Sequence, residues 1–342
     1  MSKKSEDQFK WPIIGHSNIV SYLKKCLATN NASHAYLFVG QSHIGKTTVA
    51  ESFVNSLICE NLHQGNGQVP CGACQCCQQL SNKIHPDVYW LKREINEKTG
   101  ELRKNISIEQ IRELQNKLSL HSFLNSYKVA VINEAEALSQ EAANSILKTL
   151  EEPTAKTVLI IITSSLSRLP KTIISRCQIL KFLPVSTKDI FDYLIKLEVD
   201  RKKAKILASL ADGLPGVAIN YYLEPDIYSD FKEKASQFVT LLKSDINERF
   251  KAVSDIINSS NIDDVKDYLV IWTRVLRDMI LIKYSAHNLV SNLNLAANLE
   301  DIDRHYTARR IIKIIKEIKL ARQYLEANVN PKLTLENLVL NF

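Results

Sequence analysis

Short apolar runs of about five residues recur through the first half of the chain, and stretches with helical periodicity separate them. Strands buried on both faces of a parallel sheet give this pattern, because the connecting helices cover both faces. The pattern therefore predicts an α/β domain with a parallel sheet. The expected strands are Ala35–Val39, Asp87–Leu91, Lys128–Ile132, Val158–Thr163 and Gln178–Phe182.

Two helices between these strands have clear boundaries. One follows Ser139 and should end before Pro153, because proline disfavours the helical conformation in the residue before it. The other opens at Ser107, whose hydroxyl can cap the first turn while Gln110 reaches back. Their apolar positions keep helical spacing: Ala143, Ile146, Leu147 and Leu150 in the first, and Ile108, Ile111 and Leu114 in the second.

The strand signal disappears after Pro184, and helical periodicity continues from about Ser186 with a break at Gly213–Gly216. A turn at Asn328–Pro331 precedes a last short helix that ends near Leu340. We expect three domains: an α/β domain at 1–183, a small helical domain at 184–225 and a helical bundle at 226–342. One stretch of the bundle is expected to hold an apolar stripe over about five turns, formed by Ala308, Ile311, Ile312, Ile315, Ile318 and Leu325.

Composition narrows the class of protein. The 342 residues are 45% hydrophobic and 24% charged, which is typical of a packed globular protein and excludes wholesale disorder. The longest aliphatic run, Val158–Ile162, is far shorter than the ~20 residues needed to cross a bilayer. Met1–Lys10 carries no secretory signal, so we expect a cytoplasmic protein. The net charge of +7 fits an anionic partner without requiring one.

A nucleotide-binding motif follows the first expected strand directly. Gly40 to Thr47 fit the pattern G-x-x-x-x-G-K-[ST]. In such a loop the backbone N–H groups face a polyphosphate, Lys46 reaches the terminal phosphates and the Thr47 hydroxyl can bind Mg²⁺. The alternative is a glycine turn that binds nothing, and the preceding strand favours ATP with Mg²⁺. Gly40, Gly45, Lys46, Thr47 and Thr48 are the expected ligands.

The acidic pair that usually accompanies this motif is incomplete. Asn133 and Glu134 follow the strand Lys128–Ile132. Glu134 can polarise an attacking water, but Asn133 lacks the negative charge that helps to hold the metal, and it could also be an ordinary capping residue. We therefore expect nucleotide binding with doubtful hydrolysis.

Cysteines predict a second cofactor site. Cys59, Cys71, Cys74 and Cys77 supply four thiolates within nineteen residues, the donor set of a structural Zn²⁺ site. Cys76 could replace Cys77, and the alternative is a set of unpaired buried thiols. The odd total of seven cysteines, without an export signal, favours metal binding over disulfides.

Together these features resemble the clamp-loader ATPases, which belong to the AAA+ proteins. The resemblance covers roughly residues 11 to 220 and returns near the end of the chain. It implies an AAA+ P-loop domain with a zinc knuckle, a small helical lid and a C-terminal all-α collar. The stretches that carry it are His34–Phe38, the cysteine segment, Ala142–Pro153, Leu169–Pro170, Ser175–Cys177 and Asn328–Leu340.

The resemblance also implies roles for two residues and a set of partners. Arg176 matches an arginine finger that enters the nucleotide site of a neighbouring subunit, and Thr163 matches, less closely, a hydroxyl that senses phosphate. The implied partners are the other clamp-loader subunits, gamma or tau and delta, in a five-membered ring. Through that ring they include the sliding clamp and primer–template DNA.

Within this family, the sequence could belong to either of two kinds of subunit. A stator is favoured over a gamma or tau motor because Asn133 replaces the metal-binding aspartate, Gly213–Gly216 lacks the lid arginine of the motor, and the sequence has no tail like that of tau. A stand-alone P-loop ATPase of DNA repair or recombination, with Glu134 sufficient for turnover, is the alternative from another class. The zinc knuckle and the collar-like C-terminal region count against it.

Overall fold

The computed structural model describes residues 8–64, 67–95, 100, 102–120, 122, 127–292, 299, 301–302 and 305–342. Residues 1–7, which make up most of the polar N-terminal stretch considered above, lie outside this part. The chain forms two compact units, residues 1–189 and 190–342. The expected division of the helical part near residue 225 stays a prediction.

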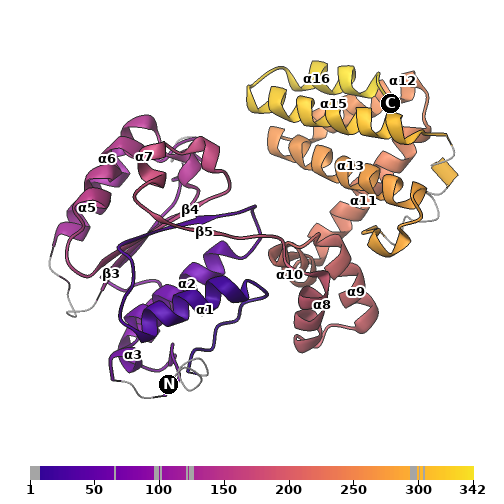
Figure 1. Cartoon of the computed structure of the whole chain (residues 1–342). Helices are drawn as coiled ribbons and strands as arrows, with labels where there is room; N and C mark the ends of the chain where they lie inside the picture. The colour runs from indigo at the N-terminus through magenta and orange to yellow at the C-terminus, as the bar shows by residue number, and fades with distance from the viewer. Residues whose placement is uncertain are drawn as a thin grey trace. The chain divides into compact units, whose positions relative to one another are not determined.

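The first unit is built on a five-stranded parallel sheet with the order β2-β3-β4-β1-β5 (Figure 1). The five expected strands are confirmed to within one residue at each end. Because all five strands run parallel, they all end at the same edge of the sheet. The strands are β1 (Ala35–Val39), β2 (Val88–Leu91), β3 (Lys128–Ile132), β4 (Thr157–Thr163) and β5 (Gln178–Lys181).

Helices cover both faces of this sheet, with α5, α6 and α7 on one face and α1 and α2 on the other (Figure 1). Strand side chains alternate between the two layers: Leu37 joins the core under α5 and α6, whereas Tyr36 packs edge-on against Phe53 of α2. The helices are α1 (Ser17–Ala28), α2 (Lys46–Ile58), α3 (Glu60–Gln64), α4 (Gln75–Ser81), α5 (Ile108–Ser119), α6 (Gln140–Glu151) and α7 (Lys171–Ile174).

The two expected helix starts are confirmed in detail. Ser107 and Gln110 form a capping box at the N-terminus of α5, and Ser139 caps α6 through a hydrogen bond from the Ala142 N–H. Such caps satisfy backbone donors that the first turn leaves unpaired, and each is worth about 1 kcal/mol. The sequence therefore fixes where both helices begin.

The second unit is helical. Its helices are α8 (Thr187–Lys196), which begins in the first unit, α9 (Arg201–Leu210), α10 (Pro215–Leu223), α11 (Pro225–Lys243), α12 (Ile246–Ser259), α13 (Ile262–Lys283), α15 (Ala308–Glu326) and α16 (Pro331–Val339). The stripe expected on α15 needs one correction. Ile312 is 44% exposed, and the buried face instead includes Ile314, because Ile311, Ile314 and Ile318 share one side of the helix.

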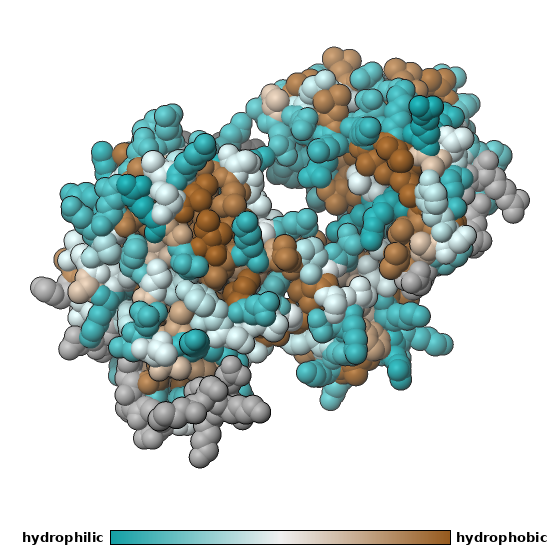
Figure 2. Space-filling view, viewed as in Figure 1, coloured by the Kyte–Doolittle hydropathy of each residue, from teal (hydrophilic) through white to brown (hydrophobic). Residues whose placement is uncertain are grey.

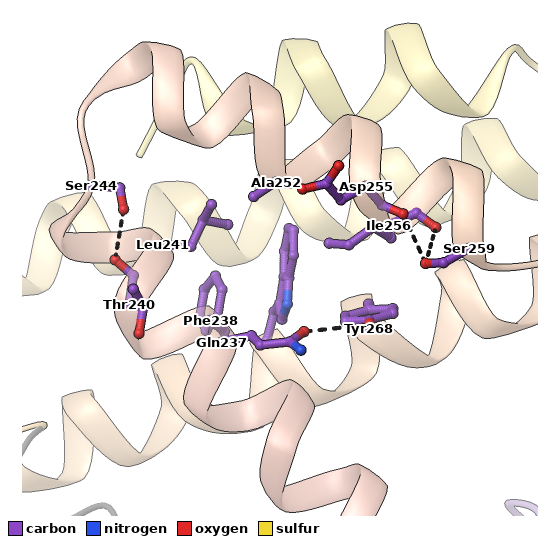
Figure 3. Close-up of a pocket in the computed structure, with 11 residues that line it drawn as sticks. Gln237, Phe238, Thr240, Leu241, Ser244, Ala252, Asp255, Ile256, Ser259 and Tyr268 are labelled. Carbon is purple, nitrogen blue, oxygen red and sulfur yellow. Dashed lines mark hydrogen bonds between the residues drawn. The ribbon is translucent and has the colours of Figure 1, made fainter.

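A pocket of about 350 Å³ lies among α11, α12 and α13 (Figure 3). The ring of Phe238 stacks on Trp272 at 4.8 Å, and both line the pocket. The hydroxyls of Ser244 and Ser259 at its margin donate to backbone carbonyl oxygens of their own helices. The pocket is thus a gap between packed helices, and these two hydroxyls at its margin already have hydrogen-bond partners in the backbone.

Hydrophilic side chains cover most of the face seen in Figure 2, with smaller apolar groups among them. Such a mixture is usual for folded proteins, which cannot cover themselves with polar atoms alone. Among the helices of the described residues, none is long and apolar enough to cross a membrane.

Candidate functional site

The predicted phosphate loop connects β1 to α2 at the edge where the strands end. Gly45 has a φ of 103°, a backbone conformation that disfavours any side chain. A Cβ on Gly40 would lie 2.8 Å from the carbonyl oxygen of Phe182, so this position has no room for one. The Gly40 N–H also donates to the carbonyl of Thr163 at 3.2 Å, which ties the loop to the end of β4.

Lys46 is the first residue of α2. Its ammonium donates to the carbonyl oxygens of Gly40 and Gln41 at 2.6 and 2.7 Å. Burial lowers the pKa of Lys46 to about 8, and the charge of Glu136 opposes this shift. The loop therefore holds a buried cation next to backbone N–H groups and a helix N-terminus, which suits a polyphosphate.

Asn133 and Glu134 follow β3, as expected. The Asn133 N–H donates to the carbonyl of Leu91 at 2.9 Å, so the backbone at this point extends the pairing with β2. Glu134 adopts a left-handed conformation with φ of 53°, and its carboxylate pairs with the Arg93 guanidinium at 2.6 Å. The predicted water-activating carboxylate is thus held by a neighbouring cation.

Two residues that the sequence analysis did not select lie at the same edge. Glu136 accepts hydrogen bonds from the backbone N–H of Ser164, at 3.2 and 3.3 Å to its two oxygens, and from the Ser164 hydroxyl. Burial acts to raise the pKa of Glu136, but hydrogen bonds, chiefly from Ser164, outweigh it and lower the pKa. The acidic spacing Glu134-x-Glu136 was the available sequence signal, but only the sheet order brings the second carboxylate to Ser164.

Thr163, the expected phosphate sensor, is the last residue of β4 and is 1% exposed. Its hydroxyl donates to the carbonyl of Ser165 and accepts from the Ser165 N–H, both at 3.1 Å. The exposed residue at this strand end is Ser164 instead. Thr163 lies beside the phosphate loop, and its sensing role stays a prediction.

Arg176 lies in the turn between α7 and β5, two positions before the start of the strand that pairs with β1. The phosphate loop follows the end of β1, whereas Arg176 precedes the start of the parallel β5. The two therefore lie at opposite edges of the sheet, which rules out a direct contact between Arg176 and the nucleotide loop of the same chain. Its guanidinium pairs with Glu151 at 2.7 Å and donates to the carbonyl of Thr172 at 3.1 Å.

The cysteine segment forms a compact cluster after α2. The sulfur atoms of Cys59, Cys71, Cys74 and Cys77 all lie within 4.8 Å of one another, and those of Cys71 and Cys77 are 3.9 Å apart. Four sulfurs bound to one zinc ion at about 2.3 Å in a tetrahedron are about 3.8 Å apart, so the residues fit the ion.

The hydrogen bonds of the cluster also favour thiolates. The N–H groups of Cys71, Cys74 and Cys77 donate to the sulfurs of Cys59, Cys71 and Cys74, respectively, at 3.3 to 3.4 Å. Backbone donors lower the pKa of Cys71 to about 6, whereas burial raises the pKa of Cys59 and Cys77. Deprotonated sulfur is the form that binds a metal.

Cys76 lies apart from this cluster. Burial and the nearby carboxylate of Glu60 raise its pKa to about 11, which favours the protonated thiol. Both Cys76 and Cys77 are in α4, where successive side chains point about 100° apart, so only one of them can face the other three cysteines. Of the two alternatives left open by the sequence, the structure brings Cys77 to the cluster.

Two family models together match most of the chain. Residues 15–186 match the family model described as "DNA polymerase III, delta subunit", and residues 229–342 match that described as "DNA polymerase III, delta subunit, C terminal". Over 94% of both chains, the sequence is 26% identical to DNA polymerase III subunit delta' of Bacillus subtilis. It is 39% identical over 145 residues to subunit delta' of Pseudomonas aeruginosa, which is 42% of each chain.

Motor-type subunits also match, over less of their length. DNA polymerase III subunit tau of Bacillus subtilis is 32% identical over 59% of this chain and 35% of its own. Among solved structures, a gamma subunit-related protein from Thermotoga maritima matches with a TM-score of 0.47 and 18% identity, covering 93% of this chain and 97% of that one.

Proposed function

The chain belongs to the DNA polymerase III delta subunit family, and from this membership we propose that it acts as a delta-prime subunit, the stator of a clamp loader. The observation that carries the proposal is the match to subunit delta' over 94% of both chains, because the match to tau covers only 59% of this chain. The partners would be gamma or tau and delta subunits, and through them the sliding clamp and primed DNA. We assign it to the cytoplasm with those partners.

The chemistry at the end of β3 supports a stator over a motor. A motor needs a carboxylate for Mg²⁺ and another for the attacking water. Here Asn133 carries no charge, and the Glu134 carboxylate is paired with Arg93 at 2.6 Å. Gly40, Gly45, Lys46, Thr47 and Thr48 would hold ATP with Mg²⁺, beside Asn133 and Thr163, with little or no hydrolysis by this chain.

Arg176 would act on the nucleotide of a neighbouring subunit. A planar guanidinium placed against a transferring phosphate stabilises its developing charge and contributes on the order of 10³ to 10⁵ in rate. The position of Arg176 at the edge opposite its own phosphate loop supports action in trans. Clamp loading would then depend on a residue of a subunit that itself turns over little ATP.

Zinc would have a structural role. Bound by Cys59, Cys71, Cys74 and Cys77, the ion would close the loop between α2 and α4 with four protein ligands and leave no open position for a substrate. The four cysteines would keep the knuckle folded.

Reconstitution tests the proposal. The purified chain is mixed with motor and delta subunits, and assembly, DNA-stimulated ATP hydrolysis and clamp loading are measured with and without it. A stator is required for a complete ring and for clamp loading, and it hydrolyses almost no ATP alone. Robust ATP turnover by the isolated chain, with no effect on the ring, would instead support a motor or a stand-alone repair ATPase.

A further inference from the structure

We propose that the carboxylate of Glu136 sets the nucleotide preference of the P-loop, disfavouring a terminal γ-phosphate so that a nucleoside diphosphate binds in preference to a triphosphate. The inference rests on nucleotide binding at Lys46, which is part of the proposed function. It assigns a role to a residue outside the motif that binds phosphate.

The position of Glu136 follows from the order of the strands. It lies in η1 (Ala135–Ala137), just after β3, and β4 lies between β3 and β1. The Ser164 N–H at the end of β4 donates to Glu136, and the preceding residue, Thr163, accepts from the Gly40 N–H at 3.2 Å. A short chain of hydrogen bonds thus connects the Glu136 carboxylate to the first glycine of the phosphate loop.

The charge of Glu136 lies at the same end of the sheet as the cation that a terminal phosphate would use. The Lys46 ammonium donates to the carbonyl oxygen of Gly40 at 2.6 Å, and the N–H of that same glycine is bonded to Thr163, the residue before Ser164. Hydrogen bonds keep the pKa of Glu136 below its usual range, so the carboxylate is ionised at neutral pH. A γ-phosphate would add negative charge near an existing one, whereas a diphosphate ends one phosphate earlier.

A role for Glu136 as a metal ligand is the competing interpretation, since Asn133 supplies no charge. Both Glu136 oxygens, however, already accept from the Ser164 N–H, and one of them also accepts from the Ser164 hydroxyl. These bonds hold the carboxylate on β4. The geometry therefore favours a fixed negative charge over a ligand free to move to Mg²⁺.

The test compares the affinities of ATP and ADP for the full chain by calorimetry, with and without Mg²⁺. The wild-type protein should bind ADP more tightly than ATP. Glu136→Gln should lower the ratio of the two dissociation constants, Kd for ATP over Kd for ADP, by about tenfold, because it removes the charge and keeps the shape. Glu136→Asp, which keeps the charge, should retain the wild-type preference. Glu141→Gln, at an exposed position in the first turn of α6, is the matched control and should change nothing.

Three results would overturn the proposal. Equal or tighter binding of ATP by the wild-type chain would do so without any variant. Weaker binding of Mg-ATP by a Glu136→Gln protein that melts like wild type would show a metal ligand instead. Absence of nucleotide binding in every form would also overturn it, while leaving the stator function to be decided by ring assembly.

Discussion

The guanidinium of Arg176 is held by the carboxylate of Glu151, with 2.7 Å between Nη2 and Oε1. Glu151 is the last residue of α6, and Arg176 precedes β5, so the pair joins two segments that lie 25 positions apart in the chain. The Arg176 side chain remains 36% exposed. This ion pair orients a cation that is still accessible to another molecule.

Replacing Arg176 tests its action on a neighbouring subunit. Arg176→Ala should leave nucleotide binding at Lys46 unchanged and lower hydrolysis at the neighbouring site by on the order of 10³, because the transition-state charge loses its guanidinium. Arg176→Lys should restore little, since an ammonium cannot contact two oxygens in one plane. DNA-stimulated hydrolysis by the assembled ring is the measurement.

Exposed Arg112 of α5 provides the matched control, and Arg112→Ala should have no effect. Arg176 could alternatively serve only to tie α6 to β5, and then its loss would lower the melting temperature and weaken assembly. An Arg176→Ala ring that assembles, melts and hydrolyses like wild type would exclude the finger.

Lys46 should make nucleotide affinity depend on pH. Its pKa is lowered to about 8, so the free protein loses the positive charge as the pH rises through 8. Phosphate is fully ionised above pH 7, since its second pKa is ~6. Affinity should therefore fall between pH 7 and 9, by at most about tenfold per pH unit. Titration of ADP at several pH values checks this, and a flat profile would contradict it.

The lowered pKa of Lys46 also makes the stability of the fold depend on pH. Between the lowered pKa of Lys46 and its ordinary value of 10.5, the unfolded chain binds more protons than the folded one. The contribution of Lys46 to the free energy of unfolding therefore rises with pH across this window and is smallest below it. Lys46→Ala removes this dependence and should abolish nucleotide binding.

Metal analysis tests the zinc site with a matched pair of cysteines. The wild-type chain, purified without chelator, should contain one Zn²⁺. Cys77→Ser should lose the ion and lower the melting temperature by more than about 5 °C, because zinc binding contributes folding free energy. Cys76→Ser should keep it, since Cys76 lies outside the cluster. Zinc well below one per chain in the wild type, or equal loss in both variants, would argue against the assignment.

Turnover by the isolated chain tests the stator directly. It should hydrolyse ATP at less than a tenth of the rate of a motor subunit, because Asn133 has no charge and Glu134 is paired with Arg93. Arg93→Ala alone should not raise the rate, because the metal-binding carboxylate is still missing. The measurement is the steady-state rate of phosphate release, taken after any initial burst. Rapid release by the wild-type chain would be incompatible with a stator.

Much of the first unit could be predicted because its signals are local. The three central strands, β1, β3 and β4, are short apolar runs that are almost entirely buried, and Ser107 and Ser139 mark helix starts by side-chain chemistry. The cysteine spacing likewise predicted the cluster. The choice between Cys76 and Cys77 required the orientation of α4, which the sequence does not contain.

What could not be predicted depends on contacts between distant segments. The carboxylate of Glu136 meets Ser164 only because β3 and β4 are neighbours in the sheet, and Glu134 meets Arg93 across 41 positions. On α15, the presence of both Ile312 and Ile314 left the buried side ambiguous, and packing selected Ile314. Periodicity identifies a helix more reliably than the direction in which it faces.

The separation of Arg176 from the phosphate loop, at opposite edges of one parallel sheet, restricts the symmetry of any assembly that uses both. A two-fold dimer joins one self-complementary patch to its copy, whereas a head-to-tail contact joins two different surfaces. A finger and a phosphate loop at opposite edges suit the second arrangement, in which each subunit contacts the nucleotide of the next. Such an arrangement closes into a ring or continues as a filament, and at any gap in the ring one subunit is left with a finger that has no nucleotide to contact.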